Sequence, residues 1–160
     1  MTIGFTGHRK YTSAQHATLL RNKISKLCEE DPRAQFLCGM AVGFDLAAGE
    51  CVLELKEQFP DIELIAVRPY ASQSEYFSDA DKLRYDNILA QCDDVITMAE
   101  NYSIELFSLR NNYIIDNSDY IVTYLDTNLK KGGTRHTIMR AKRKAIPIDN
   151  IFPSAQLSLF

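Results

Sequence analysis

The chain has 160 residues, of which 46% are apolar and 24% charged, and a formal net charge of −3. This length suits a single domain whose core is large enough to fold without disulfides or metals. The composition is that of a soluble globular protein, and the negative net charge argues against a general nucleic-acid binder. Because no apolar run could span a bilayer and the N-terminus lacks a secretory signal, we expect a cytoplasmic protein with no membrane partner.

The four cysteines, Cys28, Cys38, Cys51 and Cys92, lie in or beside apolar stretches and show no C-x-x-C spacing. Disulfides and a zinc site both fit this pattern poorly. We therefore expect buried free thiols in a reducing compartment, with no metal site and no certain cofactor.

The first part of the chain alternates short apolar runs with amphipathic segments. Residues 2–6, 34–38 and 62–67 are short, mainly apolar runs, the first and third with β-branched side chains, which predicts buried strands. Residues 13–30 and 44–58 carry apolar side chains at helical spacing, which predicts one helix after each of the first two strands.

A polar and aromatic segment, residues 69–81, follows the third expected strand and is too long for a tight turn. We interpret it as a functional loop that leads into a helix over residues 80–92.

The same alternation continues to the end of the chain. Residues 94–99 and 119–125 are expected strands, and residues 104–117 and 133–144 are expected helices. A short sixth strand, residues 145–148, is expected at an edge of the sheet because Pro147 cannot donate a ladder hydrogen bond.

This order predicts an α/β fold with a doubly wound, mostly parallel sheet of about six strands, in a single domain covering residues 1–150. Residues 151–160 are expected to form a flexible C-terminal tail. In such sheets, ligands bind beyond the carboxyl ends of the strands, where the strand order reverses.

Three glycine-bearing segments follow expected strands: FTGHR at 5–9, CGMAVGFD at 38–45 and KKGGTRH at 130–136. Glycine between a strand and a helix start lets backbone N–H groups converge on an anion, with help from the helix dipole. We therefore expect a cleft for a phosphate-bearing small molecule. Its candidate ligand-binding residues are Gly7, His8, Arg9, Gly39, Gly43, Asp45, Gly132, Gly133, Thr134 and Arg135.

Other interpretations of these residues stay open. The glycine segments could serve only as turns, and Asp45 could cap its helix rather than hydrogen-bond a ribose hydroxyl. Residues 130–144 contain seven Lys or Arg residues and no acid. That segment is either a solvated basic face or a helix whose first turn, with Arg135 and His136, faces phosphate.

Six ordered motifs resemble the YpsA-type branch of the SLOG superfamily across roughly residues 2–148. They are FTGHR, GMAVGFD, the Pro69–Gln73 loop with Arg84-Tyr85, Tyr102, RNNYIIDNSD and GGTRHT. The resemblance implies a Rossmann-like fold and a site for a nucleotide or nucleotide-derived ligand such as an ADP-ribose-like molecule. It brings no settled biochemical activity with it.

The superfamily also includes the Lonely Guy phosphoribohydrolases, whose P-G-G-x-G-T-x-x-E motif supplies a glutamate for N-glycosidic cleavage. Aligning Gly133-Thr134 with that G-T pair places Thr137 at the glutamate position. Cleavage needs a carboxylate near the developing oxocarbenium ion. Asp45, Asp116 or Asp126 could substitute for it, so a nucleotide N-glycosidic hydrolase with a non-standard carboxylate is the alternative function. Asp116 also fits an ordinary helix-to-strand turn.

The chain ends in Gln156-Leu157-Ser158-Leu159-Phe160, which resembles the pentapeptide by which many bacterial proteins dock on the DNA polymerase sliding clamp. Docking on the clamp and packing of these apolar residues on their own domain are both open.

The function expected from these observations is binding of a nucleotide or nucleotide derivative by a sensor or adaptor, with or without clamp tethering. Tyr70 and Tyr76 in the long loop are candidates to cover the base. Direct nucleic-acid binding is not expected, and a homo-oligomer that pairs through surface helices is an open alternative.

Overall fold

The computed structural model describes residues 1–153, without the side chains of residues 13–15. In it, six parallel strands form one sheet in the order β4-β3-β2-β1-β5-β6. The strands are β1 (Thr2–Gly7), β2 (Gln35–Cys38), β3 (Glu63–Tyr70), β4 (Asp94–Ala99), β5 (Tyr120–Tyr124) and β6 (Ile148–Asn150). The helices between them are α1 (Ser13–Glu30), α2 (Phe44–Leu55), α3 (Asp79–Gln91), α4 (Glu105–Asp116) and α5 (Gly133–Arg143).

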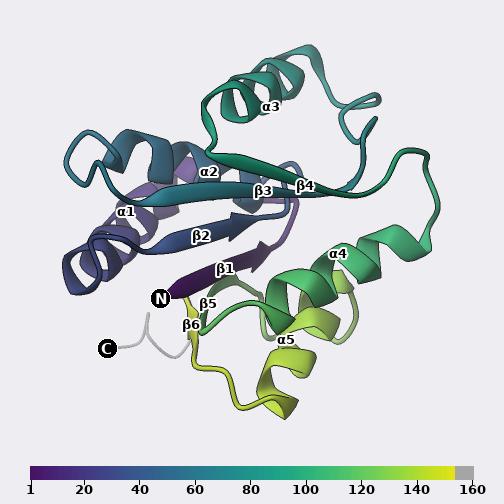
Figure 1. Ribbon diagram of the computed structural model, residues 1–160. Coiled ribbons are helices and arrows are strands. Elements are labelled where there is room, and N and C mark those ends of the chain that lie inside the picture. Colours follow the sequence, from purple (N-terminus) through teal and green to yellow (C-terminus); the bar gives the residue numbers. More distant parts are fainter. Residues whose placement is uncertain (154–160) are drawn as a thin grey trace.

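Helices cover both faces of the sheet. From β1 the chain moves outward through β2 and β3 to β4, and α4 then returns it to the other side of β1, where β5 pairs. Right-handed crossovers in opposite directions put α1, α2 and α3 on one face and α4 and α5 on the other, as Figure 1 shows. The expected α/β, Rossmann-like, doubly wound sheet is confirmed, and the strand order reverses between β1 and β5.

The main core lies between the sheet and α1–α2. Phe5 of β1 stacks on Phe36 of β2, with ring centroids 5.7 Å apart, and meets the edge of Phe44 from α2. Each of these three rings is at most 1% exposed. The close fit fixes the position of the first turn of α2 relative to β1, which matters for the site below.

The structure differs from the expected elements mainly near their ends. β3 continues through Pro69 to Tyr70, and α2 stops at Leu55 because Lys56–Gln58 turn back toward β3. β6 begins at Ile148 rather than before Pro147 because proline lacks the ladder donor; its edge position is confirmed. β4 is the other edge strand, and none of its residues is buried although most are apolar.

The four cysteines are free thiols; Cys28, Cys38 and Cys51 are buried as expected, whereas Cys92 is partly exposed. Among the described residues, no helix is long and apolar enough to cross a membrane. Nor do these residues place three or more His, Cys, Asp or Glu side chains as a metal-binding group.

The last described residues remain attached to the domain. The Ile151 N–H donates to the Thr123 carbonyl at 2.9 Å, and the Phe152 ring lies 4.9 Å from the Tyr124 ring. The folded domain therefore includes residues 151 and 152, which the sequence assigned to the tail. Residues 156–160, the expected clamp-binding pentapeptide, lie outside the described residues.

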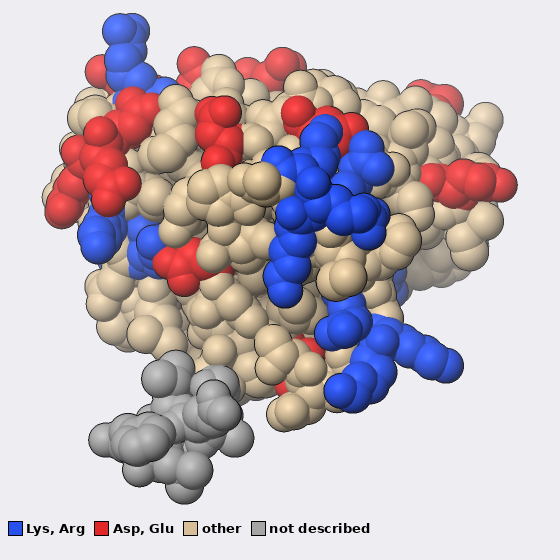
Figure 2. Space-filling view, turned by 90° about the horizontal axis from the view of Figure 1, so that it is seen from below, with Lys and Arg blue, Asp and Glu red and all other residues tan. Residues whose placement is uncertain are grey.

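The basic segment 130–144 lies at the lower side of Figure 1, and Figure 2 shows Lys and Arg side chains gathered on the same side. Arg140 and Lys144 form ion pairs with Asp116 of α4, at 2.9 and 2.7 Å. Lys142 and Arg143 are exposed, as a solvated basic helix face requires.

Candidate functional site

A cavity of about 360 Å³ opens where the strand order reverses, beyond the carboxyl ends of β1 and β5. This is the position at which doubly wound sheets bind ligands. Six of the residues that the sequence singled out line it: Gly7, His8, Arg9, Asp45, Gly133 and Thr134. We call this cavity the switch-point cleft.

Asp45 is a buried carboxylate in the wall of the switch-point cleft, and its residue is only 6% exposed. One oxygen, Oδ2, accepts a hydrogen bond from the Ala41 N–H at 3.2 Å, so the side chain braces the loop before α2 rather than capping the helix. The other oxygen, Oδ1, has no hydrogen-bond partner among the described residues. Burial raises the pKa of Asp45 to about 6.

Arg110 of α4 faces Asp45 and is also 6% exposed, although the sequence analysis did not select it. Its Nη1 donates to the Gly39 carbonyl oxygen, and its Nε donates to the Asn111 side chain at 2.7 Å. Desolvation lowers the pKa of its guanidinium while the Asp45 charge opposes that shift. The sequence held a sign that Arg110 is buried, because this arginine shares a helix face with apolar Leu106 and Ile114, at i−4 and i+4.

The glycines at the carboxyl edge of the sheet are of two kinds. Gly39 and Gly43 are tightly packed: a Cβ on Gly39 would lie 2.9 Å from both Arg110 Nη1 and Asp45 Oδ2, and one on Gly43 would collide with the Arg9 carbonyl. Gly132 and Gly133 face open space, with nothing within 4 Å of an added Cβ. The first kind positions the buried charges, and the second leaves the start of α5 accessible.

His8 joins the two sides of the switch point. Its imidazole Nε2 accepts a hydrogen bond from the backbone N–H of Asp126 at 2.8 Å, and the backbone N–H of His8 donates to the Tyr124 carbonyl. Burial lowers the pKa of His8, which favours the neutral imidazole that this acceptor role requires. The sequence proposed His8 as a ligand donor, and the structure places it in the cleft wall with one nitrogen already engaged.

The remaining predicted residues lie around or away from the switch-point cleft. Gly132 is the N-cap of α5, with φ +126°, and Arg135 points from the first turn of that helix without lining the cavity. Asp116 lies at the C-terminal end of α4, where its ion pairs lower the pKa of its carboxyl to about 2. Asp116 is therefore charged near neutral pH and pairs with Arg140 and Lys144 of the basic segment.

The cleft continues into a second cavity of about 380 Å³, which shares Arg9, Ala41 and Phe107 with it. Tyr70, Tyr76 and Phe77 line this second part together with Phe107. Edge-on contacts hold Tyr70 in place, since its ring centroid lies 5.3 Å from that of Tyr102 and 5.8 Å from that of Phe107. Tyr76 is 92% exposed. We call this part the aromatic cavity.

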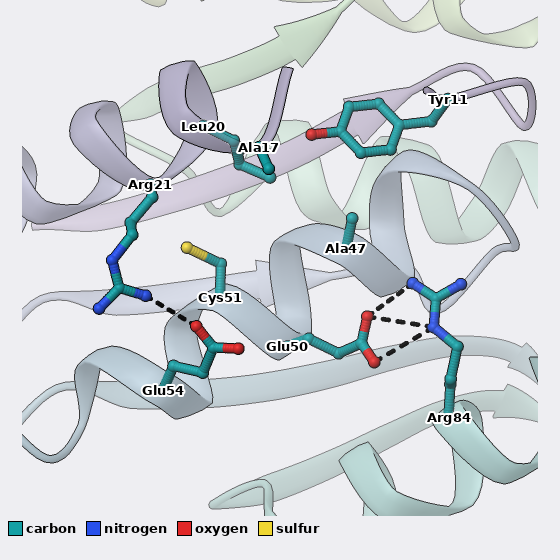
Figure 3. Close-up of a pocket in the computed structure, with 9 residues that line it drawn as sticks. All are labelled: Tyr11, Ala17, Leu20, Arg21, Ala47, Glu50, Cys51, Glu54 and Arg84. Carbon is teal, nitrogen blue, oxygen red and sulfur yellow. Dashed lines mark hydrogen bonds and ion pairs between the residues drawn. The ribbon is translucent and has the colours of Figure 1, made fainter. Parts of the chain in front are cut away.

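A separate hollow of about 320 Å³ lies between α1 and α2 (Figure 3). Its charged side chains are already paired with each other: Arg21 with Glu54 at 2.7 Å, and Arg84 with Glu50 at 2.6 Å. It therefore offers an anion less than the switch-point cleft does, where Arg9 and the N-terminus of α5 both line the cavity.

The fold is shared with solved structures. DNA processing protein A (DprA) from Streptococcus pneumoniae superposes with a TM-score of 0.65 and 19% sequence identity over 92% of this chain, which spans 48% of that protein. TM1055 superposes with a TM-score of 0.57 and 13% identity, covering 92% of this chain and 71% of the other. At these identities the likeness establishes the fold alone.

Sequence relatives are closer. The UPF0398 protein of Bacillus thuringiensis (strain Al Hakam) is 31% identical over 127 residues, which cover 78% of this chain and 68% of that protein. A UPF0398 protein of Bacillus cereus (strain AH187) matches to the same extent. The model of the YpsA family, described as the YspA SLOG family, matches residues 5–153, and the chain thus belongs to this family.

Proposed function

We propose that the protein binds a nucleotide or a nucleotide-derived ligand such as an ADP-ribose-like molecule, and acts as a sensor or adaptor. The observation that carries the proposal is the switch-point cleft, in which buried Asp45 and Arg110 face the open N-terminus of α5. Among the described residues these two charges form no ion pair with each other. A ligand that offers both an anionic group and a hydroxyl would satisfy both.

Each part of such a ligand matches a part of the switch-point cleft or of the aromatic cavity that continues it. The N–H groups of Gly133 and Thr134 at the start of α5, with Arg9 opposite, suit phosphate. The unpartnered Oδ1 of Asp45 suits a ribose hydroxyl, because a carboxylate oxygen only accepts hydrogen bonds. The aromatic cavity, with Tyr70 and Tyr76, suits the flat apolar faces of a base.

The test is binding of AMP and ADP-ribose to the purified chain, followed by native mass spectrometry and calorimetry. Arg9→Ala should weaken binding about tenfold or more, the effect expected for loss of a charge-assisted hydrogen bond. Arg21→Ala is the matched control, since Arg21 is an exposed arginine that lines the separate hollow. The proposal fails if neither nucleotide binds, or if both variants lower the affinity equally.

A second candidate is hydrolysis of a nucleotide N-glycosidic bond, and Asp45 is the observation that favours it. A carboxyl group with its pKa raised to about 6 is matched to general acid–base work near neutral pH. Of the carboxylates proposed from sequence, Asp45 lines the cleft, whereas Asp116 is held in ion pairs by Arg140 and Lys144. Release of free base from nucleoside monophosphates, abolished by Asp45→Asn but not by Asp116→Asn, is the expected result; no free base from the unaltered chain excludes it.

The C-terminal pentapeptide supports a further part of the proposal, tethering to the bacterial DNA sliding clamp through Gln156–Phe160. The amide of Gln156 and the apolar side chains of Leu157, Leu159 and Phe160 suit a preformed apolar pocket. Clamp binding in the micromolar range, lost on removal of residues 156–160 with nucleotide affinity unchanged, is the expected result. Equal clamp binding by the full and shortened chains would exclude tethering.

A further inference from the structure

The aromatic cavity has a polar end at the start of α3, which no part of the proposed function has used. Ser78 and Asp81 line it there, beside Tyr76 and Phe77. Ser78 is the N-cap of α3, and its Oγ accepts a hydrogen bond from the Asp81 N–H at 3.2 Å. This bond fixes the first turn of the helix and with it the position of the Asp81 side chain.

Asp81 presents one occupied and one unoccupied carboxylate oxygen. Oδ1 accepts from Arg84 Nη1 at 3.2 Å. Among the described residues, Oδ2 takes part in no hydrogen bond or ion pair. Arg84 is held chiefly by Glu50, through three contacts of 2.6–3.1 Å, so its position does not depend on Asp81.

A further polar side chain of the aromatic cavity, the amide of Gln73, already has hydrogen-bond partners within the protein. Gln73 is 7% exposed, its Nε2 donates to the Gly39 carbonyl at 2.9 Å, and its Oε1 accepts from the Tyr85 hydroxyl at 3.0 Å. Both ends of the Gln73 amide are therefore used in fixing the loop to the cleft. At the end of the cavity beside α3, the polar side chains that remain to recognise a base edge are Asp81 and Ser78.

A carboxylate oxygen accepts hydrogen bonds and repels carbonyl oxygens, so it distinguishes bases by what their edges carry. The amino groups of adenine and guanine are donors, whereas hypoxanthine has a carbonyl at the position of the adenine amino group, no amino group, and the ring N1–H as the donor on that edge. We propose that Asp81 selects nucleotides whose purine carries an exocyclic amino group, which donates to Oδ2. This inference rests on the proposed function, since it places the base in the aromatic cavity and the phosphate in the switch-point cleft.

The experiment measures the affinities of AMP, GMP and IMP for the unaltered chain and for Asp81→Asn by calorimetry. The unaltered chain should bind the better of AMP and GMP at least about tenfold more tightly than IMP, because an unmet hydrogen bond to a charged group costs about that factor. Asp81→Asn should bring the three affinities to within about threefold of one another, since an amide can donate as well as accept.

Asp79→Asn is the matched control. Asp79 lies in the same first turn of α3 and is exposed, but it does not line the cavity, so it reports the loss of one negative charge alone. It should keep the preference for amino-bearing purines.

The outcomes separate this inference from the proposed function. If no nucleotide binds the unaltered chain, both the proposed function and the selection by Asp81 are overturned. If nucleotides bind but IMP matches AMP and GMP, nucleotide binding stands and selection by an amino group is overturned. If the preference exists and survives in Asp81→Asn, or is lost equally in Asp79→Asn, the role of Asp81 is overturned. If a variant folds poorly, the ranking on the unaltered chain still tests selection by an amino group: equal affinities for AMP, GMP and IMP overturn it.

Discussion

Gly133 is the first residue of α5, and nothing lies within 4 Å of the position that a Cβ would take. Gly133→Ala should therefore leave the melting temperature unchanged or raise it, because alanine favours helix by up to about 1 kcal/mol over glycine. The added methyl group would occupy the space in which a phosphate meets the N–H groups of the helix. We expect the affinity for AMP to fall about tenfold, equivalent to about 1.4 kcal/mol, measured by calorimetry beside a thermal melt.

Gly43 provides the contrast for that experiment. It has φ +85°, and a Cβ there would collide with the Arg9 carbonyl. Gly43→Ala should lower the free energy of unfolding by more than about 1 kcal/mol, because both strain and overlap oppose it. An intact AMP affinity in Gly133→Ala would contradict a phosphate site at the start of α5.

Asp45 should make stability depend on pH. Burial raises the pKa of its carboxyl from 3.8 to about 6, so in this interval the folded state keeps a proton that the unfolded state has lost. The contribution of Asp45 to stability is therefore complete below about pH 4 and falls as the pH rises to about 6, by about 3 kcal/mol at most.

Asp45→Asn removes that titration. Its free energy of unfolding should exceed that of the unaltered chain at pH 7.5 and match it at pH 4, as measured by urea denaturation at both pH values. Asp116 is a suitable control, because its ion pairs with Arg140 and Lys144 lower its pKa to about 2, which gives the opposite pH dependence. A variant that is less stable than the unaltered chain at pH 7.5 would show that Asp45 is held in the charged form by Arg110.

At the scale of elements, we expect the loop between β3 and α3, residues 71–78, to be held by Gln73 more than by its two aromatic residues, Tyr76 and Phe77. Gln73→Ala would leave the Tyr85 hydroxyl without its buried acceptor and the Gly39 carbonyl oxygen without one of its donors, and should lower the free energy of unfolding by about 1–3 kcal/mol. Tyr76→Ala, at a residue 92% exposed, should change stability by less than about 0.5 kcal/mol. Chemical denaturation of both variants checks this; equal effects would mean that the loop is held by its aromatic contacts.

The order and type of all the elements could be predicted from the sequence because apolar periodicity and glycine-marked turns agree along this chain. What could not be predicted depends on neighbours that are distant in sequence. Arg110 becomes part of the site only because α4 crosses back over β1 and brings it to Gly39, 71 residues earlier. The apolar periodicity of this helix places Arg110 on its buried face, but it does not tell which part of the protein packs against that face.

The glycine segments show the same limit. Their placement at the carboxyl edge was predictable, since parallel strands end together. Whether a glycine makes room for a ligand or for the protein itself was not, because this depends on packing. The missing side chain of Gly7 makes room for the Phe44 ring and that of Gly39 for Arg110, whereas Gly133 faces open space. Of these three glycines, Gly133 is the one with room for a ligand beside its Cα, and the ligand-binding role of all three stays a prediction.

At the scale of the whole molecule, the switch-point cleft is built by both halves of the sheet. β1 and α2 supply Gly7, Arg9 and Asp45, and α4 and α5 supply Arg110 and Gly133. His8 ties the halves together through the Asp126 N–H. A ligand in the cleft should therefore stabilise segments that are far apart in the sequence, in proportion to the logarithm of its concentration above Kd.

Hydrogen exchange followed by mass spectrometry can detect this footprint. Saturating AMP should slow exchange in peptides covering residues 7–12, 39–46 and 130–136 together, because one ligand contacts all three. Peptides covering residues 50–58, beside the hollow between α1 and α2, should exchange at the same rate with and without AMP. Protection confined to residues 17–21 and 47–54 would instead place the ligand in that hollow. Protection of residues 7–12 without residues 130–136 would mean that the start of α5 takes no part in binding, and would remove the phosphate site from the proposal.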